Sequence, residues 1–431
     1  NIDGGRLEAE GDYRIESSNG NYSNGTLKMA NESDYVLVKG NFLMNSRNEH
    51  KNYLTAGLLE VKGDFTQKST YYYSGIENFR AGGSHKVILS GERTQTVSFE
   101  DPSYSRFNIL GISDTAYGVK FDTAISINKM NSMDKILTTL EINNILSPLA
   151  GDVTINGDFT LNGEKLDLAG HALYVKGKMT QTGGTIDING GRIEIDEMFL
   201  QTGGMMNINT GRLEVGRDYR IENSGSYSNG ILKMVNEVDY VLVKGNFLMN
   251  SRIEHNNYLT AGVLELKGNF TQISSYYYSG SENFRAGGSH KVILSGSTVQ
   301  TVSFEDTSSS RFNILEISDD AYGVKFGTVI SIKTLRNINN IKSPLTLYKV
   351  DEPLSTDVII DGDLIINGAN INLSGHTLKV TGNLRHYQGI INIDGGRLEA
   401  EGDYRIESSN GSYSNGILKM VNESDYVLVK G

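Results

Sequence analysis

The sequence predicts an all-β fold, a parallel β-helix (β-solenoid) with coils of about 20 residues arranged in long tandem repeats. Three observations support this prediction. A long segment recurs along the chain, a shorter period recurs within it, and the composition favours strands and tight turns over helices. Of the 431 residues, 49 are glycine and 23 are tyrosine, whereas 4 are proline and none is tryptophan or cysteine.

The long repeat defines the predicted domains. Residues 392–431 match residues 1–40 at all but 3 of 40 positions, and a further copy starts at Asn207. We therefore expect one long repeat over 1–206, a second over 207–391, and the start of a third over 392–431. The first and last coils resemble internal coils rather than caps, so we expect the stack to continue on both sides.

Each short period contains three predicted strands. The apolar residues of the first strand recur 20 positions apart, at Val153, Leu173, Ile193 and Leu213. Those of the second strand recur at Leu166, Ile186 and Met206, and a third, weaker strand centres on Phe159, Met179 and Phe199. Apolar and polar residues alternate within each run, which indicates a strand with one buried face. Glycine and asparagine between the runs indicate tight turns.

The two complete long repeats differ in length by one coil. The interval from Arg6 to Arg212 is 206 residues, and the interval from Arg212 to Arg397 is 185 residues. The first repeat carries an extra block at 185–204, and the second lacks one serine near Ser17. A stack of coils can gain or lose a whole coil without a change of register, whereas a globular core seldom tolerates such a deletion. The difference therefore favours the solenoid.

The middle of each long repeat is less regular. In 54–127 and the matching segment 259–332 we expect strands joined by loops that bulge from one side of the coil. The segments 128–146 and 333–357 resemble each other least, and they predict a long loop or an irregular coil. A short helix at 133–140 is the alternative for part of the first of them.

Composition and charge exclude several classes of function. The net charge is −11, and no basic block is present, so we expect no nucleic-acid partner. No apolar run approaches 18 residues, so we expect no membrane insertion. Because the chain has no cysteine, it has no disulfide, no thiolate nucleophile and no cysteine metal site.

One long motif resembles a known class of repeat. The segment FRAGGSHKVILSGERTQTVSFEDPSYSRFNIL at 79–110 has a close copy at 284–315, and the pattern L-x-V-x-G-D/N-F occurs at 59–65. These segments resemble β-solenoid repeats of very large secreted and cell-surface proteins of Gram-positive, clostridia-like bacteria. The resemblance covers most of each long repeat. It implies a long, repetitive extracellular β-structure, such as an extracellular fibre, and it transfers no catalytic residue.

Candidate residues for chemistry are few. The seven histidines lack a second ligand at metal spacing, so we interpret them as structural: His50, His85, His171, His255, His290, His376 and His386. Paired carboxylates occur at Asp361 and Asp363, and turn oxygens of this kind are able to bind calcium. An Asp or Asn recurs at the same position in successive coils, which favours a role in turns. We expect no catalytic residue, no cofactor and no enzyme activity, with calcium as the alternative.

Two tyrosine runs are the candidates for an inter-chain or ligand contact. They are Tyr71, Tyr72 and Tyr73 in the first repeat and Tyr276, Tyr277 and Tyr278 in the second. Exposed aromatic clusters mark interfaces and stack on sugars. The alternative is an aromatic ladder within a strand. The Asn-Ser-Arg loops at 45–47 and 250–252 are further candidates.

Together these features predict a structural segment of a long extracellular bacterial fibre, stalk or giant surface protein, secreted or on the cell surface. Its expected partners are further copies of the same repeat, in the same chain or in neighbouring chains, and the cell wall or glycans. Two alternatives remain. One is a surface adhesin or carbohydrate-binding module. The other is a polysaccharide-degrading β-helix enzyme, which would need a non-repeated cluster of acids and bases.

Overall fold

The protein is all-β in the part of the chain that the computed structural model describes, residues 1–70, 78–224, 227–275, 282–409 and 413–431. These residues form 42 strands and one turn of 3-10 helix, η1 (Glu282–Phe284). The chain divides into two compact units, unit 1 (Asn1–Phe199) and unit 2 (Leu200–Gly431), and β20 (Phe199–Gln201) lies at the division. The all-β prediction is confirmed.

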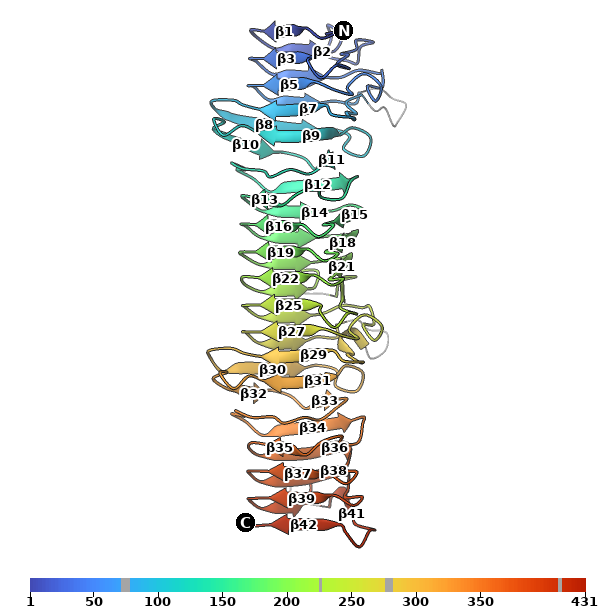
Figure 1. Cartoon of the computed structure of the whole chain (residues 1–431), viewed down its shortest axis with the longest axis vertical. Coiled ribbons are helices and arrows are strands. Elements are labelled where there is room, and N and C mark those ends of the chain that lie inside the picture. Colours follow the sequence, from blue (N-terminus) through green and yellow to red (C-terminus); the bar gives the residue numbers. More distant parts are fainter. Residues whose placement is uncertain (71–77, 225–226, 276–281, 410–412) are drawn as a thin grey trace. The chain divides into compact units, whose positions relative to one another are not determined.

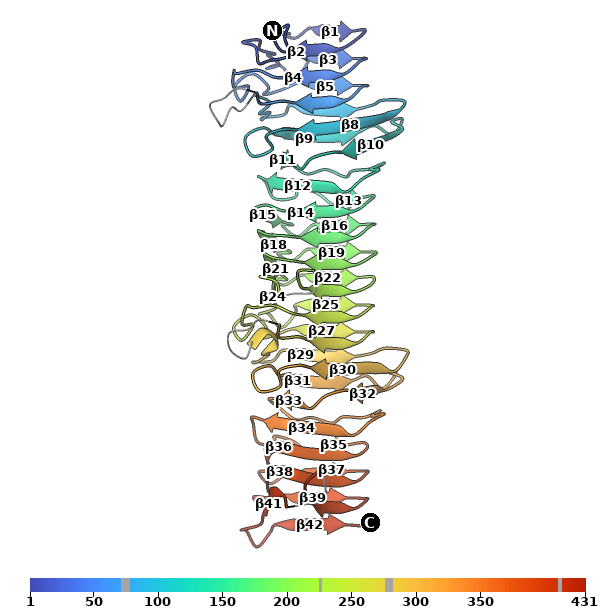
Figure 2. The ribbon, with the colours of Figure 1, turned by 180° about the vertical axis from the view of Figure 1, so that it is seen from behind.

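Unit 1 consists of parallel sheets whose strands stack one above another (Figure 1). One run of neighbouring strands is β1 (Arg6–Ala9), β3 (Tyr35–Val38), β5 (Leu58–Val61), β7 (Lys86–Leu89), β9 (Phe107–Ile112), β11 (Ile125–Lys129), β12 (Leu140–Ile145), β14 (Phe159–Leu161) and β17 (Met179–Gln181). A second run is β2 (Tyr13–Ile15), β4 (Phe42–Met44), β6 (Phe65–Gln67), β8 (Thr94–Phe99) and β10 (Gly118–Phe121). The remaining strands are β13 (Val153–Ile155), β16 (Ala172–Val175) and β19 (Arg192–Ile195) in a third run, and the pair β15 (Lys165–Asp167) and β18 (Thr185–Asp187), seen from behind in Figure 2.

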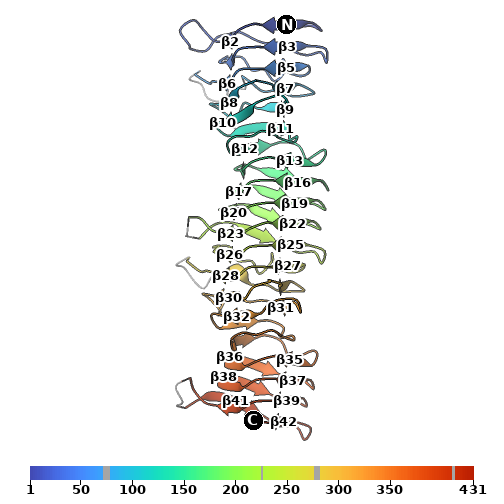
Figure 3. The same ribbon diagram turned by 90° about the vertical axis from the view of Figure 1, so that its left-hand side faces the viewer.

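Unit 2 has the same plan. Its first run is β22 (Arg212–Val215), β25 (Tyr240–Val243), β27 (Val263–Leu266), β29 (Lys291–Leu294) and β31 (Ile314–Ile317), and its second is β23 (Tyr219–Ile221), β26 (Phe247–Met249), β28 (Phe270–Gln272), β30 (Gln300–Phe304) and β32 (Val324–Phe326). Towards the C-terminus come β33 (Ile330–Ile332), β34 (Leu345–Val350), β36 (Leu364–Asn372), β38 (Leu384–Asn392) and β40 (Tyr404–Ile406), with β41 (Asn415–Lys419) also paired to β38. Beside them lie β35 (Val358–Ile360), β37 (Thr377–Val380), β39 (Arg397–Ala400) and β42 (Tyr426–Val429), as Figure 3 shows. The pair β21 (Met205–Asn207) and β24 (Ile231–Lys233) completes the unit.

The strand registers confirm the predicted period and its three strands. Val153 pairs with Leu173, Leu166 with Ile186 and Phe159 with Met179, so the chain returns to each ladder after 20 residues. The extra block of the first repeat follows the same rule, because Leu173 of β16 pairs with Ile193 of β19. Insertion of this block therefore adds strands to existing ladders and leaves their register unchanged.

The core of each unit is filled by the inward-facing residues of these ladders. Leucine, isoleucine and valine at the paired positions have no exposed surface, as at Leu173 and Ile193. Aromatic rings stack in the second run of unit 1, where the ring centroids of Tyr13 and Phe42 are 5.8 Å apart and those of Phe42 and Phe65 are 5.1 Å apart. Because parallel strands in register place equivalent residues about 4.8 Å apart, like side chains meet like side chains along the stack.

The irregular segments form strands rather than long loops. Within 128–146 lies most of β12, and within 333–357 lies β34, each paired to its neighbour with a register shift. The alternative of a helix at 133–140 is wrong. Met133 bridges to Ile155, Ile136 bridges to Val119, and Met133 is fully buried, so this segment is held extended by its neighbours on both sides.

These segments also exchange strands between runs. In unit 1, β7 and β9 belong to the strand type that starts each long repeat, yet the same sheet continues through β11 and β12 to β14, which follows a Gly-Asp turn. In unit 2, Phe312 bridges to Ile332, and β33 leads through β34 to β36. The strand columns that the 20-residue period predicts are therefore right on either side of this region but change places across it.

Four histidines lie in the core, where they have no exposed surface: His50, His85, His255 and His290. His50 accepts a hydrogen bond from the Leu27 N–H through Nε2 at 3.1 Å, which requires a neutral ring. Neither ring nitrogen of His85 or His290 has a partner within the described residues. Burial lowers the pKa of His85 to about 4 and that of His290 to about 3.

This burial predicts a loss of stability in mild acid. An unfolded histidine binds its proton near pH 6.5, whereas His85 in the folded chain binds it only near pH 4. The unfolded state therefore binds more protons in this window, and the free energy of unfolding should fall as the pH drops from about 6.5 to about 4. Urea unfolding across this range measures the slope. We expect a shallower slope for the His85→Leu/His290→Leu variant, whereas replacing the half-exposed His171 by Gln should leave it unchanged. Equal slopes in all three proteins would contradict the assignment.

Candidate functional site

The tyrosine runs at Tyr71, Tyr72, Tyr73 and Tyr276, Tyr277, Tyr278 lie outside the described residues, so their role as contacts stays a prediction. The Asn-Ser-Arg loops are poor candidates for an outer contact. Asn45 and Ser46 are buried, and Ser46 donates a hydrogen bond to the Gly25 carbonyl at 2.8 Å. Asn250 and Ser251 are buried in the same way. The amide and hydroxyl groups of these loops tie neighbouring segments of their own unit together.

The recurring Gly-Asp/Asn motif forms a ladder of side chain to backbone bonds. Asp12 accepts the Asn41 N–H through Oδ1 at 2.8 Å, Asn41 accepts the Asp64 N–H at 2.8 Å, and Asp64 accepts the Thr96 N–H at 2.8 Å. In unit 2 the same ladder runs from Asp218 to Asn246, Asn269 and Thr301, and a later one runs from Asp363 through Asn383 to Asp403. Each side chain thus satisfies a backbone donor of the following coil.

The glycine of the motif allows the turns to approach this closely. The Gly63 N–H donates to the Gly40 carbonyl at 2.9 Å, and the Gly40 N–H donates to the Gly11 carbonyl at 3.0 Å. A Cβ on Gly63 would lie 2.4 Å from the Gly40 oxygen, and a Cβ on Gly40 would lie 2.5 Å from the Gly11 carbonyl carbon. No side chain fits at such distances from backbone atoms. The motif therefore combines a close backbone contact with a side-chain acceptor.

A second carboxylate recurs at the start of each long repeat. Asp34 accepts the N–H groups of Ala30 at 2.7 Å and Asn31 at 3.0 Å, and it also accepts the N–H of Gly4 from the preceding coil. Burial alone would raise the pKa of Asp34, but the N–H bonds from Asn31, Gly4 and Ala30 hold it below its ordinary value. Asp239 and Asp425 bind the matching three donors in the other copies. The copies share this contact as well as their sequence.

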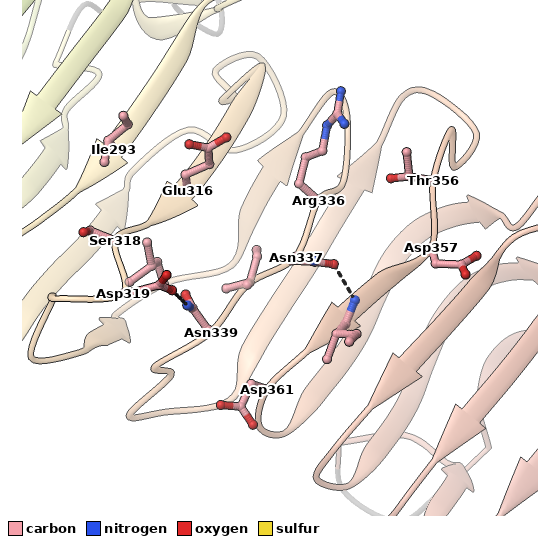
Figure 4. Close-up of a pocket in the computed structure, with 13 residues that line it drawn as sticks. Ile293, Glu316, Ser318, Asp319, Arg336, Asn337, Asn339, Thr356, Asp357 and Asp361 are labelled. Atoms are coloured by element: carbon pink, nitrogen blue, oxygen red, sulfur yellow. Dashed lines mark hydrogen bonds between the residues drawn. The ribbon is translucent and has the colours of Figure 1, made fainter.

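The largest hollow is a groove of about 720 Å³ in unit 2, drawn in Figure 4. It lies between the end of β31, the segment 336–339 and β35. This segment contributes only a one-residue bridge, from Ile338 to Ile360, where other coils form a strand, and this leaves a depression. The lining residues are Ile293, Glu316, Ile317, Ser318, Asp319, Arg336, Asn337, Ile338, Asn339, Thr356, Asp357, Ile359 and Asp361.

The groove combines an acidic lining with an apolar floor. Four carboxylates and one guanidinium face it, and Ile359 of the floor is 44% exposed. Figure 4 places Arg336 and Thr356 towards one end and Asp361 towards the other. Asp361, predicted from the sequence as part of a carboxylate pair, lines the groove, whereas its partner Asp363 belongs to the turn ladder. The structure therefore separates the two.

Each groove carboxylate already binds a neighbouring coil. Asp319 accepts from the Asn339 side chain at 2.8 Å, and Glu316 pairs with Lys291 at 2.8 Å. Asp357 accepts the Thr377 N–H at 2.8 Å, and Asp361 accepts the Thr381 hydroxyl at 2.9 Å. Each of these oxygens has a second lone pair available to a ligand. The carboxylates hold coils together and present hydrogen-bond acceptors to the groove at the same time.

Sequence reasoning missed Glu316, Asp319, Asp357 and Arg336. A comparison of the two repeats would have found part of the signal. The positions 205 residues earlier than Glu316, Arg336 and Asp361 carry Gly111, Asn131 and Asn156. Charges at these three positions thus belong to the second repeat alone. Only the fold shows that they gather around one depression.

Metal and membrane features are simple to report. Among the residues that the structure places, no three His, Cys, Asp or Glu side chains gather closely enough to hold a metal ion. The same residues contain no helix of the length and apolar character needed to cross a bilayer. Comparison of the chain with protein-family models, with curated proteins and with solved structures gives no match.

The close glycine contact predicts a position-specific cost. Replacing Gly63 by Ala should lower the free energy of unfolding by about 1–3 kcal/mol, because the added methyl group meets the Gly40 carbonyl and the turns must move apart. Chemical denaturation measures the change. Gly82→Ala is the matched control, since a Cβ there has no atom within 4 Å. Equal losses in the two variants would rule out close turn stacking.

The alternation of Asp and Asn in the ladder predicts a charge effect. Asn41 lies between Asp12 and Asp64, so Asn41→Asp would place three carboxylates in adjacent coils. We expect a loss of roughly 0.2–1 kcal/mol at pH 7 from like-charge repulsion, and recovery when the carboxyl groups are protonated. Asn41→Ala should instead lose about 1 kcal/mol at every pH, because the Asp64 N–H loses its acceptor. Unfolding at pH 7 and pH 3.5 distinguishes the two. A pH-independent effect of Asn41→Asp would contradict the charge argument.

Proposed function

We propose that this chain is a structural segment of a long extracellular bacterial fibre, stalk or giant surface protein, and that each of its units is a β-solenoid with coils of about 20 residues. One observation carries the proposal. The contact between consecutive coils is the same wherever the Gly-Asp/Asn motif recurs: a backbone bond between turns, a side-chain acceptor for the next turn, and in-register apolar ladders below.

A contact of this kind suits an extended scaffold. The acceptor side of one coil complements the donor side of the next, so coils can be added without new types of contact. Hydrogen bonds along the stack and apolar side chains in the core resist extension, heat and proteolysis together. The natural partners are further copies of the same repeat, in the same chain or in neighbouring chains. The specific function is then carried by the repetition rather than by a single residue.

The extracellular and bacterial assignment rests on one feature, the resemblance of 79–110 and 284–315 to repeats of very large secreted and surface proteins. We propose no enzyme activity and no cofactor. A general acid–base pair needs carboxyl groups with different environments and a free proton-transfer path. The groove carboxylates are instead engaged in bonds between coils.

The second candidate function is a surface adhesin or carbohydrate-binding module, which the groove favours. Its exposed Ile359 offers an apolar floor for a sugar ring, and Asn337, Asn339 and the carboxylates offer polar groups for hydroxyls. Binding of cell-wall or other glycans would be compatible with a scaffold that presents the groove at intervals.

Electron microscopy of the native material tests the scaffold proposal. We expect continuous unbranched fibres whose axial period matches one long repeat, labelled along their length by an antibody raised against residues 1–206. Isolated short rods, or label confined to the fibre ends, would overturn it.

A glycan array tests the second candidate with the purified chain. Binding that is lost on Asn337→Ala with Asp361→Ala places the ligand in the groove, whereas binding lost on Tyr72→Ala with Tyr277→Ala places it at the tyrosine runs. Gly82→Ala serves as the control for folding and display. Absence of glycan binding, or binding that survives both pairs of substitutions, would overturn a role for these residues.

A further inference from the structure

Unit 2 holds a half-buried ion pair at the start of its irregular region. The Arg311 guanidinium contacts the Asp351 carboxylate, with Nη1 and Oδ2 2.5 Å apart, and each side chain is 17% exposed. Lys349 binds the same carboxylate at 2.9 Å, and Lys333 pairs with Glu352 at 3.0 Å. These charges join β33, β34 and the residues just before β31 into one network.

The matching positions of unit 1 are known from the strand registers. Ser331 pairs with Lys349 in unit 2, and Ser126 pairs with Asn144 in unit 1, so the two regions align residue by residue at an offset of 205. By this alignment Arg311 corresponds to Arg106. The other four charges have neutral counterparts: Asn128 for Lys333, Asn144 for Lys349, Leu146 for Asp351 and Ser147 for Glu352.

Unit 1 thus keeps the arginine and lacks its carboxylate. Within the described part of the chain, the Arg106 guanidinium has no ion-pair partner, and its Nε is buried without a hydrogen bond. Leu146 occupies the position of Asp351 and is 44% exposed. The backbone setting is the same in both units, because Arg80 bridges to Arg106 as Arg285 bridges to Arg311.

The electrostatic environment differs accordingly. Burial, and then the positive charge of Arg80, lower the pKa of the Arg106 guanidinium. Burial also lowers the pKa of Arg311, but Asp351 opposes that effect. A half-buried cation without a counter-ion is unfavourable, and an anion delivered to it gains charge-assisted hydrogen bonds.

We propose that Arg106 is a binding position for a carboxylate that comes from outside unit 1 and takes the place that Asp351 holds in unit 2. The internal ion pair is the template for this ligand, since it shows that the position accepts a carboxylate against the guanidinium edge. The exposed Leu146 adds an apolar contact beside the charge, which suits an organic carboxylate better than a small inorganic anion. The carboxylate has two possible sources, a free small acid or an acidic side chain of another protein chain.

Thermal unfolding of the purified full chain tests the proposal. Malonate is titrated against sodium chloride at constant ionic strength, and a glutamate-rich hexapeptide is titrated in parallel. We expect a saturable rise in the unfolding midpoint of about 3 °C once the ligand exceeds its dissociation constant tenfold. A response to malonate identifies a free acid as sufficient, and a response to the peptide alone identifies an acidic side chain as the source.

Three variants make the test specific. Arg106→Gln and Leu146→Asp should each abolish the response, the first by removing the cation and the second by supplying an internal carboxylate. Leu146→Asp should also raise the midpoint without ligand. Asp351→Leu recreates the unit 1 arrangement in unit 2 and should increase the response; Asp351→Asn serves if that variant fails to fold. No response to either ligand, or a response that survives Arg106→Gln, would overturn the proposal.

Discussion

The bond from each Gly-Asp/Asn turn to the next coil is the contact on which both units depend. A parallel stack leaves the backbone donors of every turn facing the preceding coil, and these donors are too close to it for water to enter. Glycine allows the approach, as at Gly63 on Gly40, and the Asp or Asn oxygen then satisfies the following N–H. The apolar ladders can stay in register only because the turns above and below repeat at the same height.

This constraint explains why the long repeats tolerate a whole extra coil but few other changes in length. The extra block at 185–204 enters ladders that already exist, so Leu173 meets Ile193 as Val153 meets Leu173. It also explains the near identity of 1–40 and 392–431 at buried and exposed positions alike. Asp34, Asp239 and Asp425 each bind the same three backbone donors, and any residue without a carboxylate there would leave donors of two coils unpaired.

Where the repeats differ, the differences collect in the irregular region and change its chemistry rather than its backbone. The second repeat gains Glu316, Arg336 and Asp361 around a groove, and it gains Asp351 as a partner for Arg311. The first repeat keeps the same strand pairing with neutral residues and an arginine that lacks a carboxylate. Two copies of one fold therefore present different charges at equivalent places, which separates the residues that hold the stack from those free to acquire a specific contact.

The sequence by itself determined the strand content, the 20-residue period with its three strands, and the exchangeability of coils, because these follow from a local alternation that repeats at a constant spacing. It also pointed to the recurring Asp and Asn as turn residues. Only the tertiary structure decided what those side chains bind, that β12 and β34 replace the expected loop, and that the strand columns change places there. The groove and the contrast between Arg106 and Arg311 were likewise decided by tertiary structure. Each depends on residues 20 or more positions apart, brought together by a region where the period breaks and local pattern carries no information.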